Sequence, residues 1–521
     1  MTLHTIKNAR TYSATRPGCL VRTTFRRIWL VAVRTHNYVL LALLLPSVAS
    51  AHSFGKVYNL PVPIWMYLYG AVGALLVSFL IVGFFVNVSS VSSNFRTKLL
   101  DHTPFWRSVD APVVRRTLRT ISLLGFFLTL ATGLFGKNDS YQNFNMTFFW
   151  VIFMLGFTYL SAVIGDLFAV INPWLTIIDV LERRKPGLFE GRRPYPARWF
   201  YYPALTLYMA FIWIELFGRI QPLSLSLILC TYSAITLSGA WWFGREAWFR
   251  YGEFLAVFFR LVAKTSPFEY TEIGGRRVLR LRQPFMGLVQ DRAEHLSLLL
   301  FVLFMLSSTA FDGIKDTVFW VAIFWKDVFK MVLPYLGGNM MDAYPFLERG
   351  YAVWQTLALV GSAYLYLGLY LLFIWAAKKI TRTGRDLREL GLDFAFSLIP
   401  IALVYNITHY YTLIATQGSQ IVRLASDPFG TGWNIFNTRG WLTAPITLDA
   451  GWVWHTQVWL ILFGHIVSVY LAHVEALKVF RNQRQATLSQ LPILIMMVVF
   501  TTVGLWILSQ PISSGQVMSP N

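Results

Sequence analysis

Four ionisable side chains lie within or at the ends of long apolar stretches of this sequence. Asp312 follows the run SSTAF, and His409 lies in VYNITHYYTL. His455 and His465 belong to one stretch, WVWHTQVWLILFGH. An ionisable group inside an apolar segment of membrane length is costly to bury and usually has a function. These four residues are therefore the candidate site. Other ionisable residues in apolar stretches are Asp166, Glu215 and His473.

Histidine and carboxylate side chains in one place can bind a metal ion or move a proton. Both are common ligands of zinc and copper, and an ion with an open coordination position activates water. We therefore predict Asp312, His409 and His465 as catalytic residues, and the same three with His455 as ligands of a divalent ion, zinc or copper. The alternative is structural, because a histidine in a membrane helix also hydrogen-bonds to neighbouring helices.

Helical geometry limits which of these side chains can meet. At about 1.5 Å per residue, His455 and His465 are roughly 15 Å apart along one helix, too far to share an ion. Helices pack about 8–10 Å apart, so His409 on a second helix can reach either of them. Asp312 would come from a third helix. We expect at least two of the four side chains to lie within coordination or hydrogen-bonding distance.

The elements that position these residues are expected to be membrane-spanning helices. Of 521 residues, 55% are hydrophobic and 13% are charged, whereas globular domains carry about 25% charged residues. Apolar runs of the ~20 residues needed to cross a bilayer recur along the chain. We predict an all-α, polytopic transmembrane helix bundle of about ten spans. These are 62–87, 118–136, 147–171, 198–217, 223–243, 294–312, 352–377, 393–416, 453–475 and 490–509.

The distribution of Lys and Arg predicts the orientation of the bundle. The loops that follow spans one, three, five, seven and nine are rich in basic residues, and the alternate loops are poor in them. Basic loops stay on the cytoplasmic side. We therefore expect both ends of the mature chain to be extracytoplasmic, in a bacterial inner membrane. Asp316–Leu336 is predicted as an amphipathic or re-entrant helix on the outer face, and Arg245–Lys264 as its interfacial counterpart on the cytoplasmic face.

The first 51 residues have the features of a secretory leader. Seven basic residues and no acidic residue precede His52, and Ala49-Ser50-Ala51 follows an apolar run, as a signal peptidase site requires. We predict a leader over 1–51 and a single integral membrane domain over 52–521. His52 would then carry the free amine, which with its imidazole makes it a candidate metal ligand. The alternative is that His52 is only the residue after the cleavage site.

Several other classes of protein are not favoured. The formal net charge of +20 comes from the leader and the loops, so we expect no nucleic-acid partner. Cys19 and Cys230 are the only cysteines, and the first lies in the predicted leader. The mature chain would therefore have neither a disulfide nor a thiolate metal site. The expected partners are the lipid bilayer and a lipophilic small molecule.

Several segments of the chain resemble one known group of proteins. They are AHSFGKVYNLPVPIWMYLYG, GDLFAVINPWLTIID, STAFDG, THYYTL and GHIVSVYLAHVEAL. Together they are similar to the multi-span membrane proteins known as fenitrothion hydrolase, over nearly all of the chain after residue 51. The resemblance implies hydrolysis of lipophilic aryl phosphotriesters with release of a nitrophenol. It also implies a partner membrane subunit.

Two other functions fit the same residues. One is a transporter or channel-like protein, in which Asp312, His409 and His465 form a path for protons or metal ions. The other is a copper-handling membrane protein, in which His52 chelates the ion. The sequence leaves the hydrolase and these two functions open.

Overall fold

The computed structural model describes residues 63–86, 97–100, 103, 110–273, 276–336, 340–442, 446–480 and 482–510. Within these residues, nine helices are long and apolar enough to cross a membrane. The prediction of an all-α, polytopic helix bundle is therefore confirmed. The nine are α2 (Ile64–Phe85), α5 (Pro112–Phe135), Phe144–Ile164, α11 (Pro222–Phe243), α15 (Leu296–Lys315), Ala343–Thr381 of α18, Leu387–Ser426, α22 (Ala450–Val479) and α23 (Gln483–Ser509). The predicted leader and His52 lie outside the described residues.

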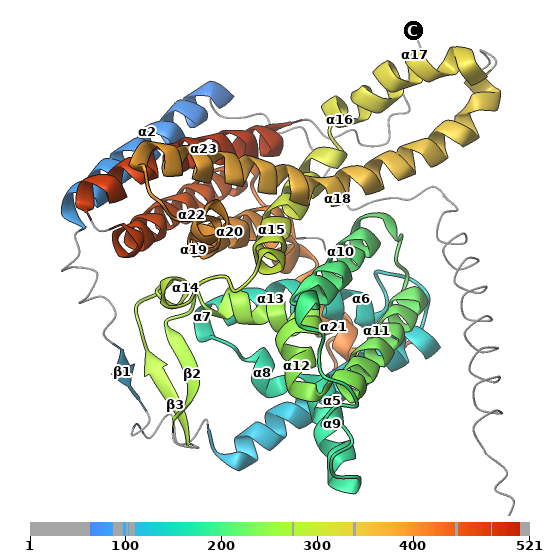
Figure 1. Cartoon of the computed structure of the whole chain (residues 1–521). Helices are drawn as coiled ribbons and strands as arrows, with labels where there is room; N and C mark the ends of the chain where they lie inside the picture. Colours follow the sequence, from blue (N-terminus) through green and yellow to red (C-terminus); the bar gives the residue numbers. More distant parts are fainter. Residues whose placement is uncertain are drawn as a thin grey trace, which may run out of the picture.

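The helices form two groups with the most buried helices between them. In Figure 1, α2, α22 and α23 lie together on one side, and α5, α11 and α9 (Pro173–Arg184) lie on the other. In the apolar stretch of α15, 83% of the residues are buried, and in that of Leu387–Ser426, 89% are. The share is 22% in α2. The segment Leu387–Ser426 contains α20 (Ile399–Thr416). The two helices that carry Asp312 and His409 are therefore central.

Local sequence signals set where these helices begin. His295 caps α15, since its Nδ1 accepts a hydrogen bond from the Ser297 backbone N–H at 3.1 Å. Asp449 caps α22 in the same way through the Trp452 N–H at 2.8 Å. Pro400 stands in the first turn of α20. Such caps satisfy backbone donors that have no partner within the helix, and proline is well tolerated at this position.

Two predicted spans differ in length from the helices observed. The span expected at 198–217 is α10 (Tyr202–Phe217), an apolar helix of 16 residues. At 1.5 Å per residue it covers about 24 Å, less than the ~30 Å of a bilayer core. The span expected at 147–171 ends at Ile164, because Gly165 has a φ of 106°. Asp166 follows that break and caps the next turn by accepting from the Ala169 N–H at 3.1 Å.

The segment Arg245–Lys264 is not one helix on the surface. A short helical stretch ends at Glu253, whose carboxylate accepts hydrogen bonds from the N–H groups of Leu255 and Ala256 and so caps α13 (Phe254–Ala263). Eight of the ten residues of α13 are buried. The second half of this segment therefore lies inside the bundle rather than at an interface.

A small antiparallel sheet was not expected from the sequence. It has the strand order β1-β3-β2, with β1 (Lys98–Leu99), β2 (Phe268–Ile273) and β3 (Arg276–Leu281). Phe268 pairs with Leu281 in the β2–β3 register. The strands are rich in charged residues, so a search for apolar runs passes over them.

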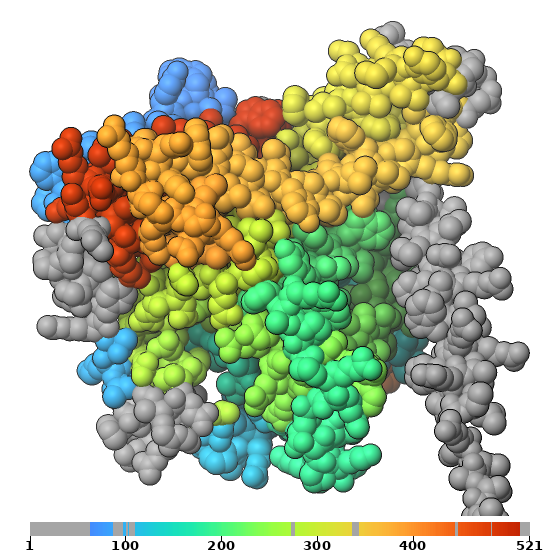
Figure 2. Space-filling model, viewed as in Figure 1, coloured from blue at the N-terminus to red at the C-terminus, as the bar shows by residue number. Residues whose placement is uncertain are grey.

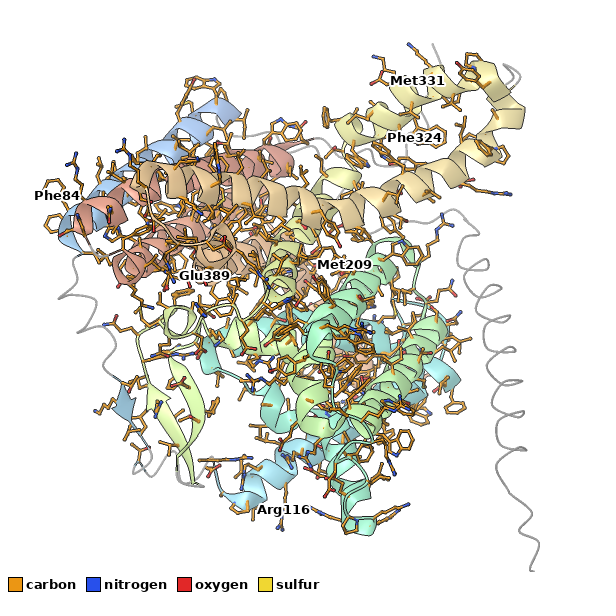
Figure 3. All side chains as sticks on the ribbon, viewed as in Figure 1. Phe84, Arg116, Met209, Phe324, Met331 and Glu389 are labelled. Atoms are coloured by element: carbon orange, nitrogen blue, oxygen red, sulfur yellow. The ribbon has the colours of Figure 1, made fainter. Side chains whose placement is uncertain are left out.

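The segment Asp316–Leu336 is not among the nine long apolar helices of the described chain, and its place at an interface stays a prediction. It contains α16 (Val318–Ala322) and α17 (Phe329–Val332) and forms, with the start of α18 (Met340–Thr381), an arm that projects from the bundle (Figures 1 and 2). Phe324 packs between the helices of the arm, with its ring 5.1 Å from that of Tyr351, whereas Met331 lies on the outside (Figure 3).

Candidate functional site

The carboxylate of Asp312 is the centre of a polar cluster between α15 and α20. His409 Nε2 lies 2.8 Å from Asp312 Oδ2. The hydroxyl of Tyr410 donates to the same oxygen at 2.6 Å. Only 13% of the Asp312 side chain and 21% of the His409 side chain are exposed. The prediction that at least two of the four candidate residues approach each other is confirmed for Asp312 and His409.

Lys315 supplies the positive charge of this cluster. Its Nζ lies 3.3 Å from Asp312 Oδ1 and 2.5 Å from Asp316 Oδ2, and only 7% of its side chain is exposed. A buried ammonium group is stable only when it is paired in this way. Lys315 follows Asp312 by three residues, which places both on one face of a helix. That spacing could have identified Lys315 from the sequence.

Glu215, on a different helix, is a third carboxyl group near the cluster, after those of Asp312 and Asp316. It lies near the end of α10 and is close enough to interact electrostatically with both Asp312 and Lys315. The sequence shows Glu215 as an ionisable residue in an apolar stretch, but nothing in it indicates that α10 packs beside α15. Tyr410 is likewise a residue whose role depends on how α20 faces α15.

The hydrogen bond to Asp312 shows which His409 nitrogen carries a proton. A carboxylate only accepts, so Nε2 of His409 carries one, and in the neutral form of the ring Nδ1 keeps its lone pair. His409 Nδ1 is buried and has no hydrogen-bond partner within the described part of the chain. A histidine held by a carboxylate, with its other nitrogen free, is the arrangement of a general base.

Close packing of α20 against α22 sets the direction in which His409 points. A β-carbon on Gly464 of α22 would lie 2.1 Å from Val404 Cγ2 and 3.1 Å from the Pro400 carbonyl oxygen, so only glycine permits this approach. Further along the same two helices, Gln457 Nε2 donates to the Thr408 carbonyl at 3.0 Å. These contacts fix the rotation of α20 and leave His409 facing α15.

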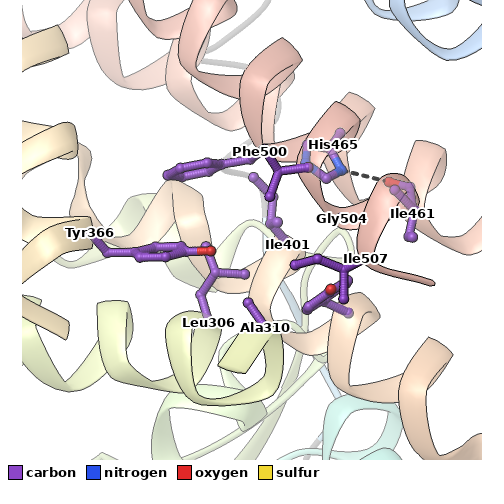
Figure 4. A pocket seen from close by; sticks show the side chains of 11 residues that line it. Leu306, Ala310, Tyr366, Ile401, Ile461, His465, Phe500, Gly504 and Ile507 are labelled. Atoms are coloured by element: carbon purple, nitrogen blue, oxygen red, sulfur yellow. Dashed lines mark hydrogen bonds between the residues drawn. The ribbon is translucent and has the colours of Figure 1, made fainter. Parts of the chain in front are cut away.

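The structure does not bring the other predicted residues to the pair formed by Asp312 and His409, which we call the dyad. His465 is 3% exposed, and its Nδ1 lies 2.8 Å from the Ile461 carbonyl of its own helix (Figure 4). His455 is exposed, with its ring 5.9 Å from that of Tyr67. In the part of the chain that the structure describes, no group of three or more His, Cys, Asp or Glu residues is placed to hold a metal ion. The metal site therefore stays a prediction, and His52 lies outside the described residues.

Comparison of the chain with known protein families, with curated proteins and with solved structures finds no match. The geometry of the cluster and the resemblance seen in the sequence are therefore the basis for a functional proposal.

Proposed function

We propose that the chain is a membrane-embedded hydrolase in which His409, held by Asp312, is the general base. The observation that supports this proposal is the 2.8 Å contact between His409 Nε2 and Asp312 Oδ2, together with the free Nδ1 of the same ring. The substrate class that we propose, lipophilic aryl phosphotriesters, comes from the resemblance to fenitrothion hydrolase. Such esters are neutral and dissolve in lipid, which suits a site inside a helix bundle.

The proposed reaction needs one proton transfer and one substitution at phosphorus. A water oxygen forms a bond to phosphorus while His409 Nδ1 takes one of its protons. The bond between phosphorus and the aryl oxygen breaks, and the nitrophenolate leaves with the electron pair. The negative charge of Asp312 stabilises the imidazolium, and Tyr410 and Lys315 keep that carboxylate in place.

A divalent zinc or copper ion is a second way to activate the water. His409 and Asp312 would be its ligands, and an ion on Asp312 Oδ2 would replace the N–H and O–H donors that this oxygen now accepts. We therefore propose a mechanism in which the dyad acts without a metal ion. Measurement of the metal content of the purified protein tests this choice.

Purified protein in detergent is expected to release nitrophenolate from a nitrophenyl dialkyl phosphotriester in proportion to protein concentration. Absorbance of the nitrophenolate measures the rate, with and without a chelator and with added Zn²⁺ or Cu²⁺. The rate per chain in membranes that contain the protein is compared with the rate of the purified protein, which tests whether a partner subunit raises it. No release above that of the same preparation carrying His409→Ala would contradict the proposal. A rate that disappears with chelator would replace the dyad by a metal-bound hydroxide.

Transport of protons is the second candidate, and one observation favours it. The buried pair Asp312–Lys315, with Glu215 beside it, places three ionisable groups within a membrane bundle. Such groups often mark proton paths. Vesicles that contain the protein and a pH-sensitive dye distinguish the two functions, since a hydrolase releases nitrophenolate without a sustained proton current.

We also propose that the chain lies in a bacterial inner membrane with both mature ends outside. The alternation of Lys- and Arg-rich loops supports this orientation, which requires the short apolar helix α10 to cross the membrane in addition to the nine longer helices. A reporter enzyme fused after Asn521 that is active only outside the cytoplasm is expected to be active. Activity of a cytoplasm-only reporter at the same position would show that the orientation is reversed.

A further inference from the structure

Two neighbouring arginines, Arg192 and Arg193, are held against the end of α11. The guanidinium carbon of Arg192 lies 4.9 Å from the centre of the Trp241 ring, and that of Arg193 lies 5.5 Å from the centre of the Trp242 ring. The backbone N–H groups of both arginines donate to the Trp242 carbonyl, at 2.8 and 2.9 Å. Each cation is therefore placed over an aromatic face, at a distance at which the two attract each other.

The loop that carries these arginines is packed closely against the helix end. Gly191 and Gly244 have φ values of 101° and 87°, which favour glycine. A β-carbon on Gly191 would lie 2.8 Å from the Gly244 nitrogen, and one on Gly244 would lie 2.9 Å from the Glu190 carbonyl oxygen. The Arg245 N–H donates to the Phe189 carbonyl at 3.0 Å. The fold of the loop therefore sets where the two arginine side chains leave the backbone.

The charges of these two arginines have no partner in the described part of the chain. Both side chains are exposed, and neither has an ion pair or a hydrogen bond with a residue that the structure describes. The neighbouring Arg245 differs, since its guanidinium lies 3.0 Å from the carboxylate of Asp179 and 2.8 Å from that of Glu182. The segment 183–198 contains six basic residues and one acidic residue. The two guanidinium groups therefore present uncompensated positive charge to a ligand outside the chain.

An apolar face runs along α11 away from this end. Leu227 is 53% exposed, Ile235 is 41% exposed and Trp242 is 40% exposed. They are seven or eight positions apart and therefore share one face of the helix. At about 1.5 Å per residue this face is roughly 22 Å long, which exceeds the roughly 15 Å of one leaflet of a bilayer core. Because α11 lies at the edge of the bundle (Figure 1), lipid chains can lie along this face.

We propose that Arg192 and Arg193 bind the headgroup phosphate of an anionic phospholipid, whose acyl chains lie along the exposed face of α11. Arginine suits this ligand because its planar guanidinium forms two parallel hydrogen bonds to a phosphate. Tryptophan at the end of a spanning helix lies at the level of the headgroups, which places both arginines at the depth of the phosphates. The net charge of an anionic lipid favours it over a zwitterionic lipid. The site shares no residue with the Asp312 cluster and does not depend on the proposed hydrolase function.

Binding of lipid to the purified protein in detergent tests this site. Native mass spectrometry measures the dissociation constants of dioleoyl phosphatidylglycerol and dioleoyl phosphatidylcholine, which have the same acyl chains. We expect the wild-type protein to bind the phosphatidylglycerol more tightly. The double variant Arg192→Gln with Arg193→Gln should weaken this binding by on the order of tenfold. Equal affinity of the wild-type protein for the two lipids would overturn the proposal.

A variant with the same loss of charge separates a defined site from general electrostatic attraction. Arg183 and Arg184 are exposed residues of the same basic segment, and neither lies over an aromatic ring in the described part of the chain. The double variant Arg183→Gln with Arg184→Gln should keep the wild-type affinity. An equal loss in both double variants would show a diffuse positive surface and overturn the site. Melting temperatures without lipid show that each variant is folded.

Two further measurements test the contacts and the source of the phosphate. Arg192→Lys with Arg193→Lys keeps the charge but loses the planar group, and Trp242→Leu removes one ring. Each is expected to weaken phosphatidylglycerol binding several-fold. Wild-type affinity in the lysine variant would show that charge alone acts there and would overturn the proposed geometry. Displacement of the lipid by an equal concentration of inorganic phosphate, at constant ionic strength, would assign the site to free phosphate and overturn the lipid.

Discussion

Replacement of His409 by alanine is expected to lower phosphotriester turnover by about 10²–10⁴-fold, the usual contribution of a general base. The variant removes the imidazole whose Nε2 lies 2.8 Å from Asp312 Oδ2, and with it the Nδ1 that would accept the proton from water. The protein should still insert and fold, because His409 sits at a partly open position and Tyr410 continues to donate to Asp312. The rate of nitrophenolate release, normalised to folded protein, measures the effect.

A matched variant shows whether the loss is specific. His473→Ala also removes a histidine from a central helix, but this ring contacts the Val86 carbonyl at 3.3 Å and lies outside the cluster. It should keep the wild-type rate. His455→Ala tests the metal prediction, since only a metal site that recruits His455 would lose activity with it. Equal rates for His409→Ala and the wild-type protein would exclude the dyad as the catalytic group.

Asp312→Asn is expected to affect both stability and rate. The amide removes the negative charge that pairs with Lys315, and removal of one partner from a buried ion pair costs about 3–5 kcal/mol. We expect a smaller loss here, because Asp316 remains 2.5 Å from the Lys315 ammonium group. The rate should fall as well, since a neutral amide does not stabilise the imidazolium form of His409. Melting temperature in detergent and nitrophenolate release measure the two effects.

A double variant separates stability from chemistry. Asp312→Asn with Lys315→Met removes both charges and keeps an unbranched apolar side chain in place of the lysine. It should regain most of the lost melting temperature but none of the lost rate. If the double variant recovers the rate, Asp312 serves only as the partner of Lys315. If Asp312→Asn alone is as stable as the wild-type protein, the pair is not a buried charge interaction in the membrane.

Some features of the protein follow from local sequence alone. A helix that crosses lipid satisfies its backbone groups internally, so an apolar run of sufficient length predicts it without knowledge of its neighbours. The runs that contain Asp312 and His409 were recognised as spans for this reason, and the two residues stood out because charge is rare in such runs. The prediction was weaker for α10, whose apolar run is shorter than the bilayer core, and it missed β2 and β3, whose charged residues give no apolar signal.

Tertiary structure decided which of the conspicuous residues meet. His455 and His465 lie on the same helix, yet His455 is exposed whereas His465 is buried, with 3% of its surface accessible. The reason is that α22 turns only one face toward α20. The basic and aromatic pattern of Arg245–Lys264 suits an interfacial helix, but the cap at Glu253 and the neighbours of α13 bury its second half. Asp312 and His409 are 97 positions apart, and their contact depends on the approach of Val404 to Gly464, which rotates α20. Apolarity is a property of single segments and can be read from the chain, whereas the facing of one helix toward another depends on side chains that are close only in space.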